Sequence, residues 1–287
     1  MEITEKVIEL ADGRKLAFAE WGPPDAPPVM YFHGFPTNRQ EVLFLTPALE
    51  QFAVNARLIV LNRPGFGSSS PQPGRSFLDW PVDVADAADQ LKIDRFAVVG
   101  VSGGCPYALA CGSILGERVT RIGIAVGVGP VEAPGMRDAT AIDGPSRIGL
   151  IRRLQFGMTA YAFKKGQEDR FFEQTLSSMG GVDKDTMADP AARTWFLEMM
   201  RESLEQGGGP SAHEAGLYRK AWGFDLGEIS TETLLQYGGA DKTVPATAGR
   251  WLAEQLPLAH FTLMPEHGHF SWMPTEEAAK LVTAVIR

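Results

Sequence analysis

The feature that most constrains the fold is a series of short apolar runs, rich in β-branched residues and bounded by Gly, Pro or polar turns. Their length is that of strands rather than helices. Helical patterns separate them, most clearly at Phe77–Leu91 and Pro106–Leu115. Apolar strands that alternate with helices predict a mostly parallel sheet covered by helices on both faces, preceded by an antiparallel hairpin. The runs are Val7–Leu10, Leu16–Trp21, Val29–Phe32, Leu58–Leu61, Phe96–Val101 and Ile122–Val126.

The middle of the chain has a different character, because aromatic, Met and charged residues recur there at helical spacing and strand runs are missing. The strand pattern then resumes, which predicts a helical insertion rather than a separate terminal domain. We therefore expect residues 1–129 and 226–287 to form the core domain and residues 130–225 to form the insertion. The later elements are expected as strands Thr233–Tyr237 and His260–Met264, a helix Ala246–Leu256, and a last helix with Thr275 as its N-cap.

Composition and charge exclude several classes of protein. The 287 residues include 27 Lys and Arg and 35 Asp and Glu, a net charge of −8, and basic residues gather only in short pairs, which argues against a nucleic-acid partner. No apolar stretch reaches the ~18 residues of a membrane span, and the start does not resemble a signal peptide. We expect a cytoplasmic protein, or a mature form whose signal has been removed. The two cysteines, Cys105 and Cys111, lie six apart in one predicted helix and are not expected to form a disulfide.

The segment with the clearest chemical meaning is Val98–Pro106, in which a buried strand runs into Gly-x-Ser-x-Gly and then into a helix of small residues. A Ser in so tight a turn has a strained backbone, and Gly100 and Gly104 leave room for it. The turn exposes the Ser102 hydroxyl at the carboxyl edge of the sheet and directs the Gly103 N–H toward a developing oxyanion. The structural alternative is a glycine-rich turn whose Ser only caps the helix.

A Ser hydroxyl needs a base to become a nucleophile, and the chain has five histidines. His33 directly follows a strand and is expected to shape a loop, whereas His213 and His260 are expected to be exposed. His267 and His269 lie in the loop after the last predicted strand, where a base can reach the carboxyl edge of the sheet. The spacing allows either of these two to be the base.

An acid that orients the base is expected at Asp241, in the turn after the strand Thr233–Tyr237. An Asp in such a turn is often an ordinary turn former. However, Ser102, Asp241 and a later His all follow strands and occur in the chain order of a known hydrolase triad. The paired histidines also suggest a metal pair, but no other ligand lies at zinc-site spacing, so neither a metal nor a cofactor is expected.

With these motifs in place, the chain resembles the α/β-hydrolase-fold serine hydrolases of the esterase and lipase superfamily over nearly its whole length. Phe32–Pro36 is similar to the family's His-Gly loop. This implies an oxyanion hole formed by the N–H groups of Phe35 and Gly103, with His33 and Gly34 in support. The resemblance also implies the α/β-hydrolase fold, with an eight-stranded, mostly parallel sheet flanked by helices and a helical cap between strands 6 and 7.

Two further segments carry the resemblance. Gly268-His269-Phe270 is similar to the family's base segment, which favours His269 over His267. The turn that ends at Ser69 resembles the family's Asp-x-Pro-Gly-x-Gly-x-Ser turn after the fourth strand. Here Asn62 and Arg63 stand where Asp-Arg or Asp-Leu is common, a small departure in a supporting turn.

In this family the segment between strands 6 and 7 commonly forms a lid over the nucleophile, and the resemblance implies that role for the predicted insertion. Its large apolar residues are expected mostly to pack its own core, with a minority lining a substrate cavity for an apolar acyl or alcohol group. These residues are Phe156, Met158, Tyr161, Phe163, Phe171, Phe172, Trp195, Met199 and Met200.

The resemblance implies a hydrolase that cleaves a carboxylic ester, thioester or lactone of a small molecule through an acyl-enzyme. A cofactor-free haloperoxidase, acting as a perhydrolase, and a carbon–carbon bond hydrolase share the same core motifs and remain open. A third class is a non-catalytic ligand receptor on the same fold. Either a monomer or a homodimer is compatible with the sequence.

Overall fold

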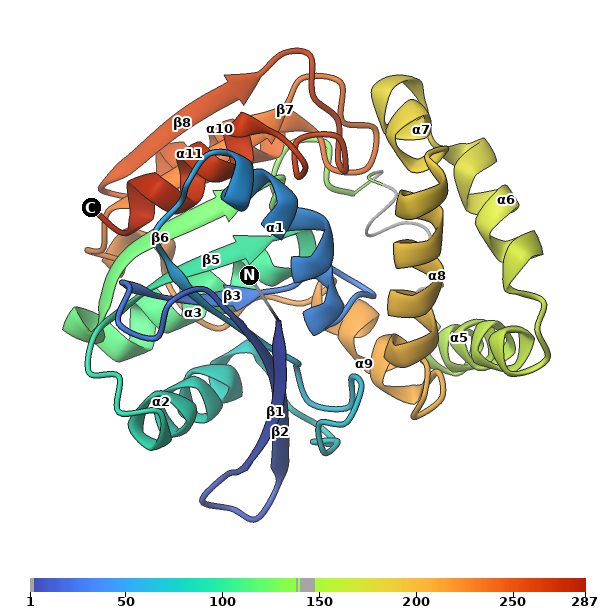
Figure 1. Cartoon of the computed structure of the whole chain (residues 1–287), viewed down its shortest axis with the longest axis horizontal. Coiled ribbons are helices and arrows are strands. Elements are labelled where there is room, and N and C mark those ends of the chain that lie inside the picture. The colour runs from blue at the N-terminus through green and yellow to red at the C-terminus, as the bar shows by residue number, and fades with distance from the viewer. Residues whose placement is uncertain (1–2, 138, 140–147) are drawn as a thin grey trace.

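The computed structural model describes residues 3–137, 139 and 148–287. Within this part of the chain, eight strands form one sheet in the order β1-β2-β4-β3-β5-β6-β7-β8 (Figure 1). β2 runs antiparallel to both β1 and β4, and the pairs from β4 through β8 are parallel. The predicted sheet and its leading hairpin are therefore confirmed. The strands are β1 (Thr4–Glu9), β2 (Lys15–Trp21), β3 (Pro28–Phe32), β4 (Arg57–Leu61), β5 (Phe96–Val101), β6 (Val119–Ala125), β7 (Thr233–Gly238) and β8 (Ala259–Met264).

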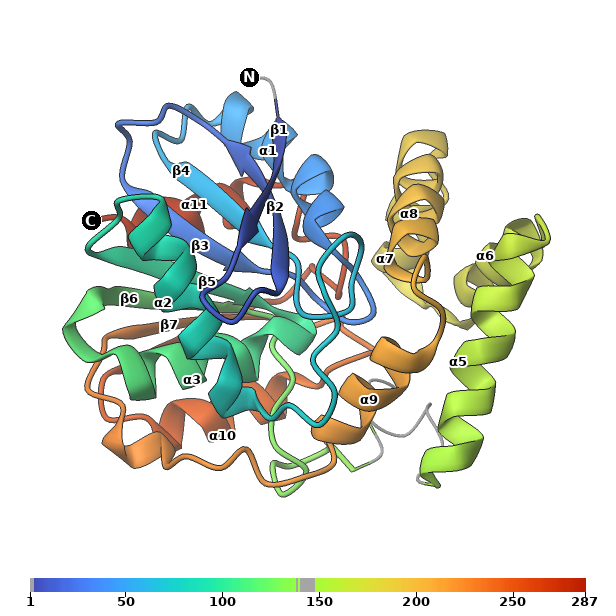
Figure 2. The same cartoon turned by 90° about the horizontal axis from the view of Figure 1, so that it is seen from below.

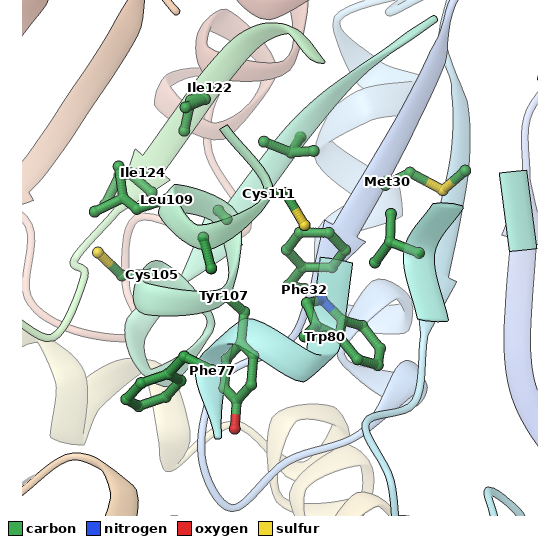
Figure 3. Close-up of a cluster of buried hydrophobic side chains, with 14 of the residues drawn as sticks. Met30, Phe32, Phe77, Trp80, Cys105, Tyr107, Leu109, Cys111, Ile122 and Ile124 are labelled. Carbon is green, nitrogen blue, oxygen red and sulfur yellow. The ribbon is translucent and has the colours of Figure 1, made fainter. Parts of the chain in front are cut away.

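Helices cover both faces of the sheet because alternate strand residues point to opposite sides. In β4, Leu58 and Val60 join the apolar core beneath α1 (Val42–Gln51) and α11 (Glu276–Val285). Ile59 and Leu61 join the core on the other face. That second core packs against three helices and is drawn in close-up in Figure 3. The three are α2 (Trp80–Gln90), α3 (Cys105–Leu115) and α10 (Ala246–Gln255).

The predicted helix limits hold with small changes. The segment expected as one helix from Phe77 begins as a 3-10 turn, Phe77–Asp79, and continues as α2. Thr275 is the N-cap of α11, and its hydroxyl accepts the N–H of Glu277 at 3.3 Å. A side-chain oxygen at this position satisfies one of the helix N–H groups that lack a partner within the helix.

The two cysteines lie on α3 and are free thiols, as the sequence predicted, and both are buried. Burial disfavours the thiolate and raises the pKa of both Cys105 and Cys111. In Figure 3 their sulfur atoms lie at different places in the core.

The chain between β6 and β7 forms a helical cap, as predicted for the insertion. Figure 2 shows its helices together on one side of the core, with α9 nearest to the sheet. The cap has an apolar core of its own, built mainly from aromatic and Met side chains. No helix within the described residues is long and apolar enough to cross a membrane. The cap helices are α5 (Gly149–Lys164), α6 (Glu168–Ser178), α7 (Gly181–Met187), α8 (Pro190–Ser203) and α9 (Gly209–Leu217).

Most of the large apolar residues of the insertion pack in the cap core or line the cavity, as expected, and two of them are exceptions. Met158 is 72% exposed and Tyr161 is 61% exposed, on the outer side of α5. They lie opposite Phe156 and Phe163, which face the rest of the protein, because positions about half a helical turn apart point in opposite directions.

Candidate active site

The candidate nucleophile lies in a tight turn between β5 and α3. Ser102 opens a short 3-10 turn and has a φ of +50°, a left-handed conformation that is strained in a residue with a Cβ. A Cβ on Gly100 would lie 2.6 Å from the carbonyl oxygen of Gly104, and one on Gly104 would overlap the carbonyl oxygen of Phe32. The strained turn and the need for glycine on both sides of it are therefore present as predicted.

Three side chains from distant parts of the sequence meet at this turn. Ser102 Oγ lies 2.9 Å from His269 Nε2, and His269 Nδ1 lies 2.8 Å from Asp241 Oδ2. The side chain of Asp241 is fully buried and that of His269 is 7% exposed. Of the two histidines that the spacing left open, His269 is the one whose ring meets both partners. The arrangement allows the imidazole to take the hydroxyl proton while the carboxylate holds the ring in orientation.

Opposing effects act on the imidazole of His269. Burial disfavours the charged form, whereas the neighbouring carboxylate of Asp241 favours it through its charge and its hydrogen bond. Asp183 and Glu41 act in the same direction as Asp241. The balance raises the pKa of His269 above its ordinary value of 6.5.

The cap contributes a buried carboxylate that the sequence analysis did not single out. Asp183 on α7 accepts the backbone N–H of His269 at 2.7 Å through Oδ2, and those of Phe270 and Ser271 at 2.8 and 3.1 Å through Oδ1. A Cβ on Gly268 would overlap this carboxylate. Asp183 therefore binds the backbone of the loop that carries His269, while Asp241 binds its ring.

The loop after β3, His33–Pro36, is called the His-Gly loop here, and it lies against the nucleophile turn. A Cβ on Gly34 would lie 3.4 Å from the Cβ of Ser102, and one on Gly103 would lie 2.7 Å from the Cβ of Phe35. The two segments predicted to supply oxyanion donors are thus in contact, and at Gly103 their close approach depends on glycine.

A second carboxylate missed by the sequence analysis lies beneath this loop. Glu41 is buried and accepts the N–H of Gly34 at 2.9 Å and the hydroxyls of Tyr31 and Thr37 at 2.6 Å each. Burial raises the pKa of Glu41 despite these hydrogen bonds. Its role in the loop is to bind the Gly34 N–H. No sequence signal marked it, because its partners are one backbone N–H and two hydroxyls that no motif links to it.

Two of the remaining histidines, His33 and His213, have rings that hydrogen-bond to backbone groups. His33 is buried; its Nε2 accepts the N–H of Arg63 at 3.3 Å and its Nδ1 donates to the Gly34 carbonyl at 2.9 Å, so it shapes the loop as expected. His213 is half-buried, with Nε2 at 2.9 Å from a backbone carbonyl, which corrects the expectation that it is exposed. His260 is exposed, as predicted.

A cavity of about 460 Å³ opens onto Ser102 and His269. The cap supplies much of its wall, and four of the nine apolar residues considered in the sequence line it, namely Phe156, Phe171, Trp195 and Met200. This size lies within the ordinary range of small-molecule sites. Among residues 3–137, 139 and 148–287, three or more His, Cys, Asp or Glu side chains do not gather at any place that could hold a metal ion.

Known proteins with related sequences give a consistent picture. The model of the alpha/beta hydrolase family matches residues 29–285. A curated relative, the dihydrolipoyllysine-residue acetyltransferase component of the acetoin cleaving system of Pseudomonas putida, is 26% identical over 266 residues. The match covers 92% of this chain and 64% of that protein. The chain thus spans less than two thirds of the relative's length.

Solved structures with the same fold have different activities. An esterase from Exiguobacterium antarcticum has a TM-score of 0.72 at 19% identity, covering 98% of this chain and 99% of its own. A bromoperoxidase from Bacillus anthracis has a TM-score of 0.70 at 20% identity, covering 98% and 97%. These likenesses establish the fold and leave the reaction open. Together with the family match over most of the sequence, they show that the chain belongs to the alpha/beta hydrolase family.

Proposed function

We propose that the protein is a serine hydrolase that cleaves a carboxylic ester, thioester or lactone of a small, largely apolar substrate. The observation that carries this proposal is the hydrogen-bonded series from Ser102 through His269 to Asp241 at the edge of a cavity of about 460 Å³. A strained Ser whose hydroxyl meets a buried imidazole has the geometry of an activated nucleophile.

The reaction follows from the positions of these groups. Ser102 Oγ attacks the substrate carbonyl carbon while His269 Nε2 accepts its proton. The N–H groups of Phe35 and Gly103 bind the oxyanion that forms. The tetrahedral intermediate collapses to an acyl-enzyme when His269 donates the proton to the leaving oxygen or sulfur. Water, deprotonated by His269, then attacks the acyl-enzyme and releases the acid.

Asp241 and the raised pKa of His269 support this role. A base accepts the Ser proton more readily when its conjugate acid is stabilised, and the adjacent carboxylate stabilises the imidazolium that forms in the transition state. Asp241 also holds the ring so that Nε2 points to Ser102.

The cavity supports an apolar substrate of moderate size. Most of its wall surface is apolar and comes largely from aromatic and Met side chains, while polar groups, including Thr37 and Lys242, are available to orient the substrate. The cap would select the acyl or alcohol group, because it provides much of the wall opposite the nucleophile.

The same three side chains serve a perhydrolase or a carbon–carbon bond hydrolase, so these alternatives differ in the substrate rather than in the residues that react. A non-catalytic receptor is disfavoured, because a binding protein has no need for a strained Ser in contact with a base. The ester hydrolase is therefore the function we propose.

The test is turnover of p-nitrophenyl esters of increasing acyl length by the purified protein and by its Ser102→Ala variant. We expect the variant to lose at least about a thousandfold in kcat, because only the oxyanion donors and substrate binding remain. A fluorophosphonate should label Ser102 in the parent and not the variant. Equal turnover by the two proteins would refute the mechanism, and turnover only of peroxide or carbon–carbon substrates would favour an alternative.

A further inference from the structure

A buried ion pair connects the cap to the core beside the His-Gly loop. Arg63 follows β4, Glu214 lies on the cap helix α9, and neither side chain is exposed. Nε and Nη2 of Arg63 lie 2.8 and 2.7 Å from Oε1 of Glu214. A second guanidinium, that of Arg75, donates to the other carboxylate oxygen at 2.6 Å. One carboxylate is thus shared by two cations, which leaves this part of the cluster with a net positive charge.

Arg63 also binds the His-Gly loop from its carbonyl side. Its Nη1 donates to the carbonyl oxygen of His33, and its Nη2 donates to that of Gly34 at 2.6 Å. The Gly34 carbonyl and the Phe35 N–H belong to the same trans peptide unit, in which they point in opposite directions. Fixing the carbonyl therefore fixes the direction of the Phe35 N–H, the expected oxyanion donor.

The guanidinium acts on the strength of this donor as well as on its direction. A hydrogen bond from a cation to a peptide carbonyl polarises the peptide unit and makes its N–H a better donor. Glu214 holds Arg63 in place as a carboxylate: burial raises its pKa, but the charges of Arg63 and Arg75 outweigh that effect and lower it. Because Arg63 and Arg75 share the carboxylate of Glu214, that carboxylate alone does not neutralise both guanidinium groups.

The nucleophile turn is linked to the same cluster through the cap. The hydroxyl oxygen of Tyr218, just after α9, lies 2.7 Å from Glu214 Oε1 and 2.9 Å from the carbonyl oxygen of Gly103. Its single proton serves one of these acceptors at a time. A Cβ on Gly103 would lie only 2.5 Å from this oxygen, so the phenol packs directly against the turn.

We propose that Arg63 and Glu214 are positioning residues for the oxyanion donor, and that the cap helix α9 thereby completes the reaction centre in addition to shaping the cavity. This inference rests on the proposed serine hydrolase function. It departs from our expectation for the Arg63 turn, in which Arg63 was a small variation in a supporting segment. The chain uses the guanidinium of Arg63 to join the cap, the loop and the oxyanion site.

The experiment compares Glu214→Gln and Arg63→Lys with the parent. Glu214→Gln keeps the side-chain shape but removes the negative charge that holds Arg63. Arg63→Lys keeps a cation but lacks the planar guanidinium group, whose several N–H donors reach two carbonyls and a carboxylate. The matched control is Glu202→Gln, which breaks another nearly buried ion pair between cap and core, to Arg39, without touching the His-Gly loop. Thermal denaturation identifies variants that fold, because breaking a buried pair destabilises a protein.

The readouts are kcat and KM for a p-nitrophenyl ester and the affinity for a trifluoromethyl ketone, whose adduct with Ser102 carries an oxyanion. Removing one oxyanion donor costs ~100- to 1,000-fold in kcat, so a misdirected donor is expected to cost about 10- to 100-fold, with KM nearly unchanged. Ketone affinity should fall by a similar factor in Glu214→Gln and Arg63→Lys and should stay near the parent value in Glu202→Gln.

Two results overturn the proposal. One is a folded Glu214→Gln or Arg63→Lys variant with kcat and ketone affinity no lower than those of Glu202→Gln. The other is a fall in kcat without a fall in ketone affinity, which would indicate a general structural effect. If Glu214→Gln does not fold, the Arg63→Lys result decides. A parent protein that neither hydrolyses esters nor binds the ketone would instead refute the proposed function itself.

Discussion

The carboxylate of Asp241 bonds to His269 with one oxygen and to its own turn with the other. Oδ2 lies 2.8 Å from His269 Nδ1, while Oδ1 accepts the N–H groups of Thr243 and Val244 at 2.7 and 2.9 Å. The turn therefore holds the carboxylate in the orientation that the imidazole requires. In this arrangement Nδ1 carries the proton and Nε2 is free to accept one from Ser102.

The pH dependence of activity is expected to follow His269. Its pKa in the folded protein is raised above 6.5, and only the neutral imidazole accepts the Ser proton, so kcat/KM should fall as pH decreases through a midpoint above 6.5. Asp241→Asn removes the charge that opposes the effect of burial, and the midpoint of its residual activity should lie at lower pH. A parent midpoint below 6.5, measured with an ester whose leaving group does not titrate in this range, would contradict the prediction.

The two neighbouring histidines provide a direct comparison. His269→Ala removes the ring that meets Ser102 and should lower kcat by about a thousandfold or more. His267→Ala removes a half-buried ring from the same loop and should keep most of the activity. Kinetics on one ester decide between them, and a reversed order would move the base by two residues.

Cap residues that line the cavity should set the acyl-chain preference. Phe171→Ala would enlarge the cavity and should shift the preference toward longer acyl chains. We expect relative transition-state binding to change by roughly 1–3 kcal/mol for each methylene-sized difference in side chain or substrate. Met158→Ala is the control, because Met158 is 72% exposed on the outer side of the cap. Ratios of kcat/KM across a series of esters measure the effect. An unchanged ranking in Phe171→Ala would leave the cap without a role in selection.

Asp183 should affect the rate although it touches no part of the His269 ring. In Asp183→Asn an amide group replaces one of two oxygens that both accept backbone N–H groups, so at least one of those N–H groups loses its partner. We expect a loss of about 1–3 kcal/mol in the free energy of unfolding and a lower kcat from a displaced His269.

The control for this prediction is Asp185→Asn on the same helix, because Asp185 is exposed. Chemical denaturation should give a lower free energy of unfolding for Asp183→Asn than for Asp185→Asn, and ester kinetics should give it a lower kcat. A stable Asp183→Asn protein with the parent's kcat would show that the His269 loop does not depend on the cap.

The triad could be predicted from the sequence because strand patterns fix where its members lie. Ser102, Asp241 and His269 each follow an apolar run, and the carboxyl ends of parallel strands meet at one edge of a sheet. The short Gly-x-Ser-x-Gly segment added the strained turn. The fold could be predicted for the same reason: alternating strand and helix patterns restrict the topology to few arrangements.

The cap carboxylates could not be predicted in this way. Asp183 and Glu214 lie in the insertion, where the pattern indicates helices but not how those helices pack on the core. The partners of Asp183 are backbone N–H groups, which every residue carries and which leave no trace in a sequence. Arg63 was visible only as a variation in a turn, because its two carbonyl partners are also backbone groups.

The burial of both thiols makes the native chain a clean background for site-directed labelling. At neutral pH neither Cys105 nor Cys111 is a reactive thiolate, since burial raises both pKa values and keeps the sulfur atoms from solvent. A maleimide dye would therefore react only with a cysteine introduced on the surface, such as Met158→Cys on the outer side of α5. Fluorescence from that position would report cap movement during turnover, and neither native cysteine would have to be replaced first.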